Sequence, residues 1–136
     1  MGVELAIPAA QHLTILLTDD DERSRSILAE LLAERGFCTY QANCGEEAID
    51  IVRQQPIHLV VFDLHMPRMT GLQALEQVRM YNSTLPALLV TADATRDVLR
   101  LAQQAHVYSV LPKPVNTTIF LHLVQRALRS TYPGTV

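Results

Sequence analysis

Short apolar runs alternate along this chain with longer segments in which apolar residues recur at helical spacing. Five runs have the length and composition of strands buried in a parallel sheet. They cover residues 14–18, 37–42, 58–62, 87–91 and 107–111. The second run is the most polar, which favours a place nearer the edge of the sheet.

Each apolar run is followed by a segment that the spacing predicts to be helical. These helices cover residues 21–35, 45–54, 71–80, 95–105 and 117–129. Gly36 is suited to end the first helix, and Asn116 can cap the start of the last. We expect Ile27, Leu101 and Ile119 to lie on the apolar faces that pack against the sheet.

The order of these elements, strand then helix five times over, predicts an α/β fold. Strands that alternate with crossover helices form a parallel sheet, and right-handed crossovers favour a doubly wound arrangement with helices on both faces. We expect one domain at residues 13–130, with a tail at 1–12 and another at 131–136. In such folds the working site lies at the carboxyl ends of the strands.

Composition narrows the class of protein. The chain has 136 residues and a net charge of −3, from 11 basic and 14 acidic residues, which argues against nonspecific binding to nucleic acid or an anionic membrane. Cys38 and Cys44 match no zinc pattern and are interpreted as thiols of a cytosolic protein. No signal peptide or bilayer-spanning run is present in the sequence, so we expect a cytoplasmic location.

Polar residues follow four of the predicted strands at the point where each ends. The first strand is followed by Asp19 and Asp20, the third by Asp63 and the fifth by Lys113, and the fourth ends in Thr91. Alone, each has an ordinary explanation as a turn, strand or surface residue. Because parallel strands end at one edge of the sheet, their joint placement predicts a single site.

Carboxylates gathered at one edge repel one another, and a bound cation would relieve that repulsion. A hard ion such as Mg²⁺, or Mn²⁺, suits an oxygen-rich set of ligands. We expect direct ligation by Asp20, Asp63 and one backbone carbonyl, with Asp19 acting through water.

These residue types also suit phosphoryl transfer. A carboxylate such as Asp63 can attack phosphorus and hold an acyl phosphate. The cation and Lys113 would neutralise the phosphoryl oxygens, and the Thr91 hydroxyl would donate a hydrogen bond to another.

The four strand-end motifs resemble the receiver domain of two-component response regulators. The resemblance covers residues 12–129, and its motifs are LLTDDD at 16–21, VFDLHMP at 61–67 with Gly71, LVTA at 89–92 and KP at 113–114. It implies a flavodoxin-like three-layer sandwich with strand order 2-1-3-4-5. It also implies a cis Lys113–Pro114 bond.

The resemblance assigns a role to each site residue. It implies that Asp63 takes a phosphoryl group from a phosphohistidine on a sensor histidine kinase or phosphotransfer protein. Asp19 and Asp20 match the acidic pair, the carbonyl of His65 a Mg²⁺ ligand, Thr91 the switch hydroxyl, and Lys113 the phosphate-binding lysine. The implied protein is a signalling module with only slow self-dephosphorylation, not an enzyme.

The expected output face comprises the fourth helix, fifth strand and fifth helix, where a downstream protein or a second copy would bind, with no nucleic acid or membrane contact. Val110 stands where many relatives have a switch aromatic, and Tyr108 either replaces that aromatic or leaves the coupling without one. His106 stands where glycine is common. Both departures concern output rather than phosphorylation.

Two residues beside the predicted nucleophile and switch leave alternatives open. The His65 ring either tunes hydrolysis of the acyl phosphate or is merely solvated. Asp93 is expected to cap the following helix, the alternative being a contact at the entrance of the site.

Three other functions compete with a phosphorylated module. A pseudo-receiver would bind partners without taking phosphate. An aspartyl-phosphate phosphatase would usually carry an acid, not His65, two residues after its nucleophile, and a flavin binder would need a loop unlike the acidic 19–22. With only 131–136 after the last helix, we expect a stand-alone module or a fragment of a longer regulator.

Overall fold

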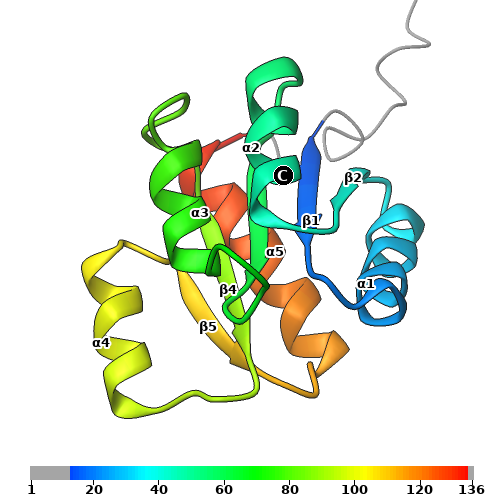
Figure 1. Cartoon of the computed structure of the whole chain (residues 1–136). Coiled ribbons are helices and arrows are strands. Elements are labelled where there is room, and N and C mark those ends of the chain that lie inside the picture. The colour runs from blue at the N-terminus through cyan, green and yellow to red at the C-terminus, as the bar shows by residue number, and fades with distance from the viewer. Residues whose placement is uncertain (1–12, 135–136) are drawn as a thin grey trace, which may run out of the picture.

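The five apolar runs form one parallel sheet in the computed structural model, which describes residues 13–134 (Figure 1). The strand order is β2-β1-β3-β4-β5, as predicted. The strands are β1 (Thr14–Thr18), β2 (Cys38–Ala42), β3 (Leu59–Asp63), β4 (Ala87–Thr91) and β5 (Ser109–Pro112). The central strands β1, β3 and β4 are buried throughout, whereas β2 lies at an edge with most of its residues partly or fully exposed.

Five helices cover the two faces of the sheet, which confirms the doubly wound α/β prediction. They are α1 (Glu22–Glu34), α2 (Gly45–Gln54), α3 (Gly71–Val78), α4 (Arg96–Gln104) and α5 (Thr117–Thr131). One apolar cluster joins α1 and α5 to the sheet, and a second joins α2, α3 and α4 to its other face. Adjacent residues of β1 pack on opposite faces of the sheet, so Leu17 belongs to the first cluster and Leu16 to the second.

Side-chain caps fix where four of the five helices begin, α2 being the exception. Asp21 Oδ1 accepts a hydrogen bond from the Arg23 amide at 3.1 Å, and Asn116 caps α5 as predicted. The prediction that Asp93 caps the fourth helix is wrong. Thr95 caps α4, and its side chain accepts a hydrogen bond from the Val98 amide.

Three apolar residues predicted to face the core are exposed instead. Ile27 is 51% exposed, Leu101 47% and Ile119 50%. Each lies beside a buried residue, and a helix rotates by about 100° per residue, so the neighbour takes the inward position. In α5, for example, Phe120 directly follows Ile119 and is fully buried.

The last strand begins later than predicted because α4 ends in a turn of its own. The Val107 amide donates to the carbonyl of Ala102, and the His106 amide to that of Gln103. This is the Schellman pattern, and it places His106 at a φ of 56°. The chain therefore enters β5 only at Ser109.

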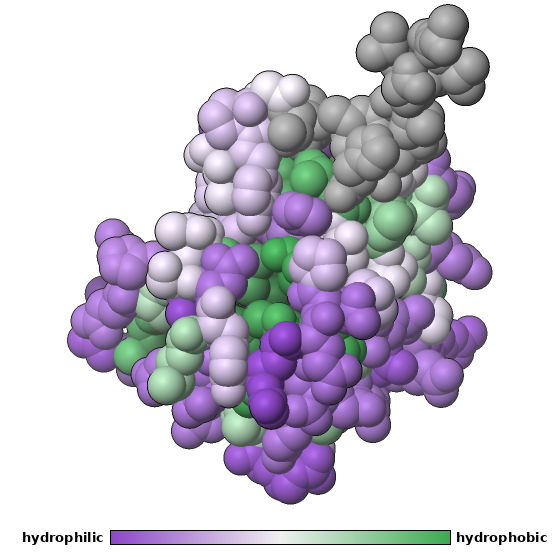
Figure 2. Space-filling view, turned by 90° about the horizontal axis from the view of Figure 1, so that it is seen from above, coloured by the Kyte–Doolittle hydropathy of each residue, from purple (hydrophilic) through white to green (hydrophobic). Residues whose placement is uncertain are grey.

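The two ends of the sheet differ in character. The carboxyl ends of the strands carry the residues singled out above, and Figure 2 shows the opposite end, where polar side chains surround small areas of apolar surface. Within residues 13–134, no helix has the length and apolar character needed to cross a membrane. The predicted tail at 1–12 and the final residues 135–136 lie outside the described residues.

Candidate functional site

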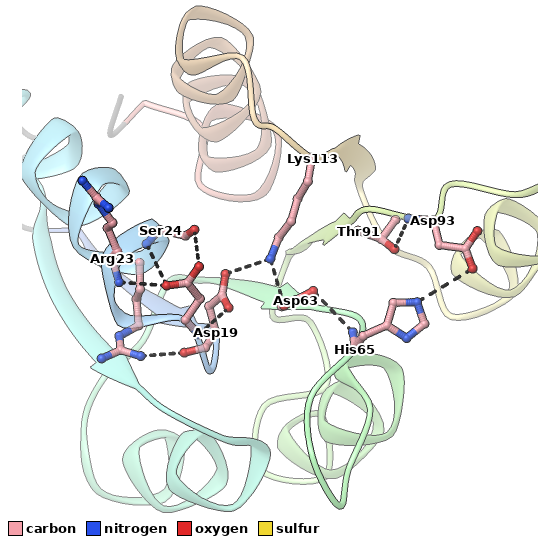
Figure 3. Close-up of polar contacts among 10 residues, drawn as sticks. Asp19, Arg23, Ser24, Asp63, His65, Thr91, Asp93 and Lys113 are labelled. Carbon is pink, nitrogen blue, oxygen red and sulfur yellow. Dashed lines mark hydrogen bonds and ion pairs between the residues drawn. The ribbon is translucent and has the colours of Figure 1, made fainter.

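Four neighbouring strands bring the predicted site residues to one edge of the sheet. Asp63 is the last residue of β3 and pairs with Val90 of β4, and Thr91 is the last residue of β4. Asp19 directly follows β1, and Lys113 directly follows β5. Lys113 reaches from its loop toward the two carboxylates (Figure 3).

Three carboxylates form a compact acidic cluster. Asp19 and Asp63 are only 8% and 6% exposed, while Asp20 is open to solvent. One oxygen of each lies within 4.8 Å of the others. A set of carboxylate oxygens this close fits a hard divalent cation, and no nitrogen or sulfur ligand belongs to the described cluster.

Lys113 supplies a positive charge to the same cluster. Its Nζ donates to Asp63 Oδ2 at 3.0 Å and to Asp19 Oδ2 at 3.2 Å. Burial disfavours the ammonium, but the hydrogen bond to Asp63 and the charges of both carboxylates outweigh it and raise the pKa of Lys113. The ammonium therefore stays charged and bridges the carboxylates that a metal ion would share.

Asp63 lies in an environment that disfavours its charge. Burial raises the pKa of its carboxyl, the neighbouring charge of Asp19 adds to the effect, and the hydrogen bond from Lys113 opposes it. The charged form of Asp63 therefore needs a nearby cation. The His65 amide also donates a weaker hydrogen bond to Asp63 Oδ1 at 3.3 Å.

The loops beside Asp63 and Thr91 meet at the entrance of the site. The Thr91 side chain is fully buried, and its Oγ1 accepts a hydrogen bond from the Asp93 amide at 3.0 Å, which leaves the hydroxyl proton for another acceptor. His65 Nε2 lies 3.9 Å from Asp93 Oδ2, with both side chains exposed (Figure 3). Asp93 thus lies at the entrance of the site and does not cap the following helix, which is the second of the two alternatives predicted for it.

Backbone geometry holds two of these loops in place. The Gly71 amide donates to the carbonyl of Leu64, and a Cβ on Gly71 would come within 2.4 Å of the carbonyl oxygen of Asp63. Only glycine therefore allows α3 to begin this close to the end of β3. On the other side of the site, the Lys113–Pro114 bond is cis, as expected.

A cavity of about 460 Å³ adjoins the acidic cluster on the α1 side. Its walls are largely apolar and come from α1, the central strands and the loop before α5. Its polar lining residues include Asp63, Lys113 and Arg25.

Sequence reasoning missed Arg25 as a member of the site. Its Nη1 donates to the carbonyl of Asp19 at 2.5 Å, and its Nε to Gln41 Oε1 at 2.9 Å. The signal was its position on the first turns of α1, one helical turn after Asp21, which places it above the acidic loop.

Comparison with known proteins gives a consistent result. Residues 15–125 match the family model described as response regulator receiver domain. A probable chemotaxis protein CheY from Rhizobium etli is 35% identical over 108 residues, covering 77% of this chain and 84% of that protein. The sensory/regulatory protein RpfC from Xanthomonas campestris pv. campestris is 33% identical over 109 residues, again 77% of this chain.

Solved structures agree on the fold. The chemotaxis protein CheY4 of Vibrio cholerae superposes with a TM-score of 0.80 at 25% identity, covering 85% of this chain and 98% of that one. A CheY-like receiver from Methanospirillum hungatei gives 0.83 at 23% identity, covering 88% and 95%. The chain spans only 15% of the length of RpfC.

Proposed function

Because the chain belongs to the family of response regulator receiver domains, we propose that Asp63 accepts a phosphoryl group from a phosphohistidine. Receiver domains are signalling modules of two-component systems that interact with histidine kinases and downstream targets. The observation that carries the proposal is the buried Asp63 carboxylate, 3.0 Å from the Lys113 ammonium and within 4.8 Å of two other carboxylates.

Receiver domains bind Mg²⁺ at an acidic pocket, and the three carboxylates here fit that ion. We propose that Asp20, Asp63 and the backbone carbonyl of His65 hold it directly, with Asp19 acting through water. When bound, Mg²⁺ supplies positive charge beside the phosphoryl oxygens.

The residues of the chain have distinct parts in the proposed transfer. A carboxylate oxygen of Asp63 forms a bond to phosphorus while the bond from phosphorus to the donor's imidazole nitrogen breaks, and that nitrogen keeps the electron pair. The Lys113 ammonium neutralises the negative charge that develops on one phosphoryl oxygen. The Thr91 hydroxyl donates a hydrogen bond to another phosphoryl oxygen. The product is an acyl phosphate on Asp63.

The proposed output is a change in the face formed by α4, β5 and α5. The new charge draws Thr91 inward, and residues behind it repack. This face exposes Leu99 and Ile119, which supports a role in binding a downstream protein or a second copy of the chain. Tyr108 is 38% exposed and outside both apolar clusters, whereas Val110 packs against one of them.

We propose that the receiver unit spans residues 13–130 and acts in the cytoplasm without contacting nucleic acid or membrane directly.

The test is incubation with phosphoramidate or acetyl phosphate and Mg²⁺, followed by intact mass spectrometry. We expect the mass of the wild type to increase by one phosphoryl group. No increase should occur when EDTA is added before the phosphodonor, or in Asp63→Ala. Asp50→Asn removes an exposed carboxylate on α2 and is the matched control, which should label like the wild type.

A wild type that gains no mass would contradict the proposal and favour a pseudo-receiver. An adduct that persists in Asp63→Ala would show that another residue is the acceptor. Rapid release of phosphate over many turnovers would favour a phosphatase instead.

A further inference from the structure

Four contacts of Asp19 hold the loop that carries Asp19 and Asp20. The Asp19 amide donates to the carbonyl of Ala42 at 3.2 Å, and Asp19 Oδ1 accepts from the Asp21 amide at 2.9 Å. Its other oxygen accepts from Lys113. The backbone carbonyl of Asp19 is then left for a fourth contact, which Arg25 supplies.

Arg25 ties this loop to the edge of the sheet. Its Nη1 donates to the Asp19 carbonyl at 2.5 Å, and its Nε donates to Gln41 Oε1 on β2 at 2.9 Å. Gln41 pairs with Leu17, two residues before Asp19. The guanidinium therefore spans from strand β2 to the loop after β1, and its rigid plane fixes the distance between them.

Arg25 takes part in no ion pair among residues 13–134, although an acidic cluster lies close by. A guanidinium that served only to balance the carboxylates would be expected to bond to one of them. Here it bonds to a carbonyl and an amide oxygen, which is the arrangement of a group that orients the backbone.

We infer that Arg25 is a positioning residue for the divalent-cation site, with Gln41 as its anchor. It sets the direction of the Asp19–Asp20 backbone and so the positions of both carboxylates. The inference rests on the Mg²⁺ site proposed above and extends it to two residues that do not touch the ion.

Electrostatics and positioning predict opposite effects, which makes the inference testable. A positive charge near a cation site weakens cation binding, so removing it should strengthen binding if charge alone matters. If Arg25 positions the loop, removing it should weaken binding. Gln41 carries no charge, so its loss should act through position alone.

The experiment is a Mg²⁺ titration followed by amide chemical shifts, on the wild type, Arg25→Gln, Gln41→Leu and the control Arg23→Gln. Arg23 is exposed on the same helix, and its side chain makes no hydrogen bond or ion pair with a site residue among residues 13–134, so its variant reports the effect of charge. We expect the Mg²⁺ dissociation constant to rise about 3- to 10-fold in Arg25→Gln and about 2- to 3-fold in Gln41→Leu, somewhat below typical outer-shell effects on metal sites. Arg23→Gln should bind as tightly as the wild type or slightly more tightly.

Thermal unfolding in EDTA separates positioning from general destabilisation. Gln41 is exposed, so Gln41→Leu should keep the unfolding temperature of the wild type while losing Mg²⁺ affinity. Binding in both variants that matches or exceeds the wild type would overturn the inference and leave the Mg²⁺ site standing. A wild type that binds no Mg²⁺ would overturn the site and the inference together.

Discussion

Lys113 donates to Asp63 at 3.0 Å, yet the pKa of the Asp63 carboxyl is raised rather than lowered. Burial and the charge of Asp19 together outweigh the ammonium. The carboxylate is thus held ionised at a cost to the fold, a cost that a bound cation would offset. This is a common arrangement where function and stability compete.

Asp63→Asn should therefore stabilise the protein at neutral pH without Mg²⁺. A carboxyl whose pKa is raised on folding contributes stability below its unfolded pKa of about 3.9, and that contribution is lost as the pH rises through the folded value. The amide escapes this loss, so we expect a gain on the order of 1 kcal/mol, or about 4 °C, at pH 7.

The gain should shrink as the pH is lowered toward the range in which Asp63 is protonated. Thermal unfolding of both proteins at several pH values in EDTA measures it, with the exposed Asp50→Asn as a control that should show little change. A variant less stable than the wild type at pH 7 would show that the bond to Lys113 outweighs the cost of burial.

His106→Gly should also stabilise the protein. His106 holds a φ of 56° at the end of α4, a conformation that costs a residue with a side chain about 1–2 kcal/mol. Glycine avoids this cost but loses more entropy on folding, roughly 0.5–1 kcal/mol, so a net gain of about 0.5–1 kcal/mol remains.

Gly36 provides the matched case, because it ends α1 in the same hydrogen-bonded pattern at a φ of 88°. Gly36→Ala should lose roughly 1 kcal/mol. Urea unfolding of both variants tests the pair, and a loss of stability in His106→Gly would mean that the imidazole contributes more than its conformation costs.

How far the sequence predicts this structure depends on which residues interact locally. Strand ends such as Asp63 and Thr91 could be placed because the apolar runs stop there, and parallel strands end at one edge. The exposure of Ile119 could not be predicted, because which of two adjacent helical positions faces inward depends on how α5 is rotated against the sheet. Arg25 was missed for a related reason: its partner Gln41 is 16 residues away and becomes a neighbour only through strand pairing.

His58 should make stability fall in mildly acidic solution. Its Nδ1 accepts a hydrogen bond from the Thr14 amide at 2.9 Å, which requires the neutral ring, and burial lowers its pKa below 6.5. Stability from a group with a lowered pKa is present above the unfolded value of about 6.5 and is lost as the pH falls through the folded value.

The wild type should therefore lose more stability between pH 7 and pH 5 than His58→Gln does. His122→Gln, which changes an exposed histidine on α5, should keep the pH dependence of the wild type. Thermal unfolding at matched ionic strength measures the difference. Equal pH dependence in the wild type and His58→Gln would mean that another group is responsible.

Arg79 should be the most sensitive arginine outside the site. Its guanidinium donates to the carbonyls of Leu85, Ala105 and His106, which join α3 to both the start of β4 and the end of α4. Arg79→Met leaves these three carbonyls, of which that of Leu85 belongs to a fully buried residue, without their donor, so we expect a loss of about 2–3 kcal/mol in urea unfolding. Arg100→Met removes an exposed arginine of α4 and should change stability by less than about 0.5 kcal/mol.

Because Ala102 is the only buried residue of α4, amide hydrogen exchange in Arg79→Met should quicken most in that helix. Exchange that quickens uniformly over the chain would instead mean that Arg79 stabilises the fold as a whole and does not specifically hold α4.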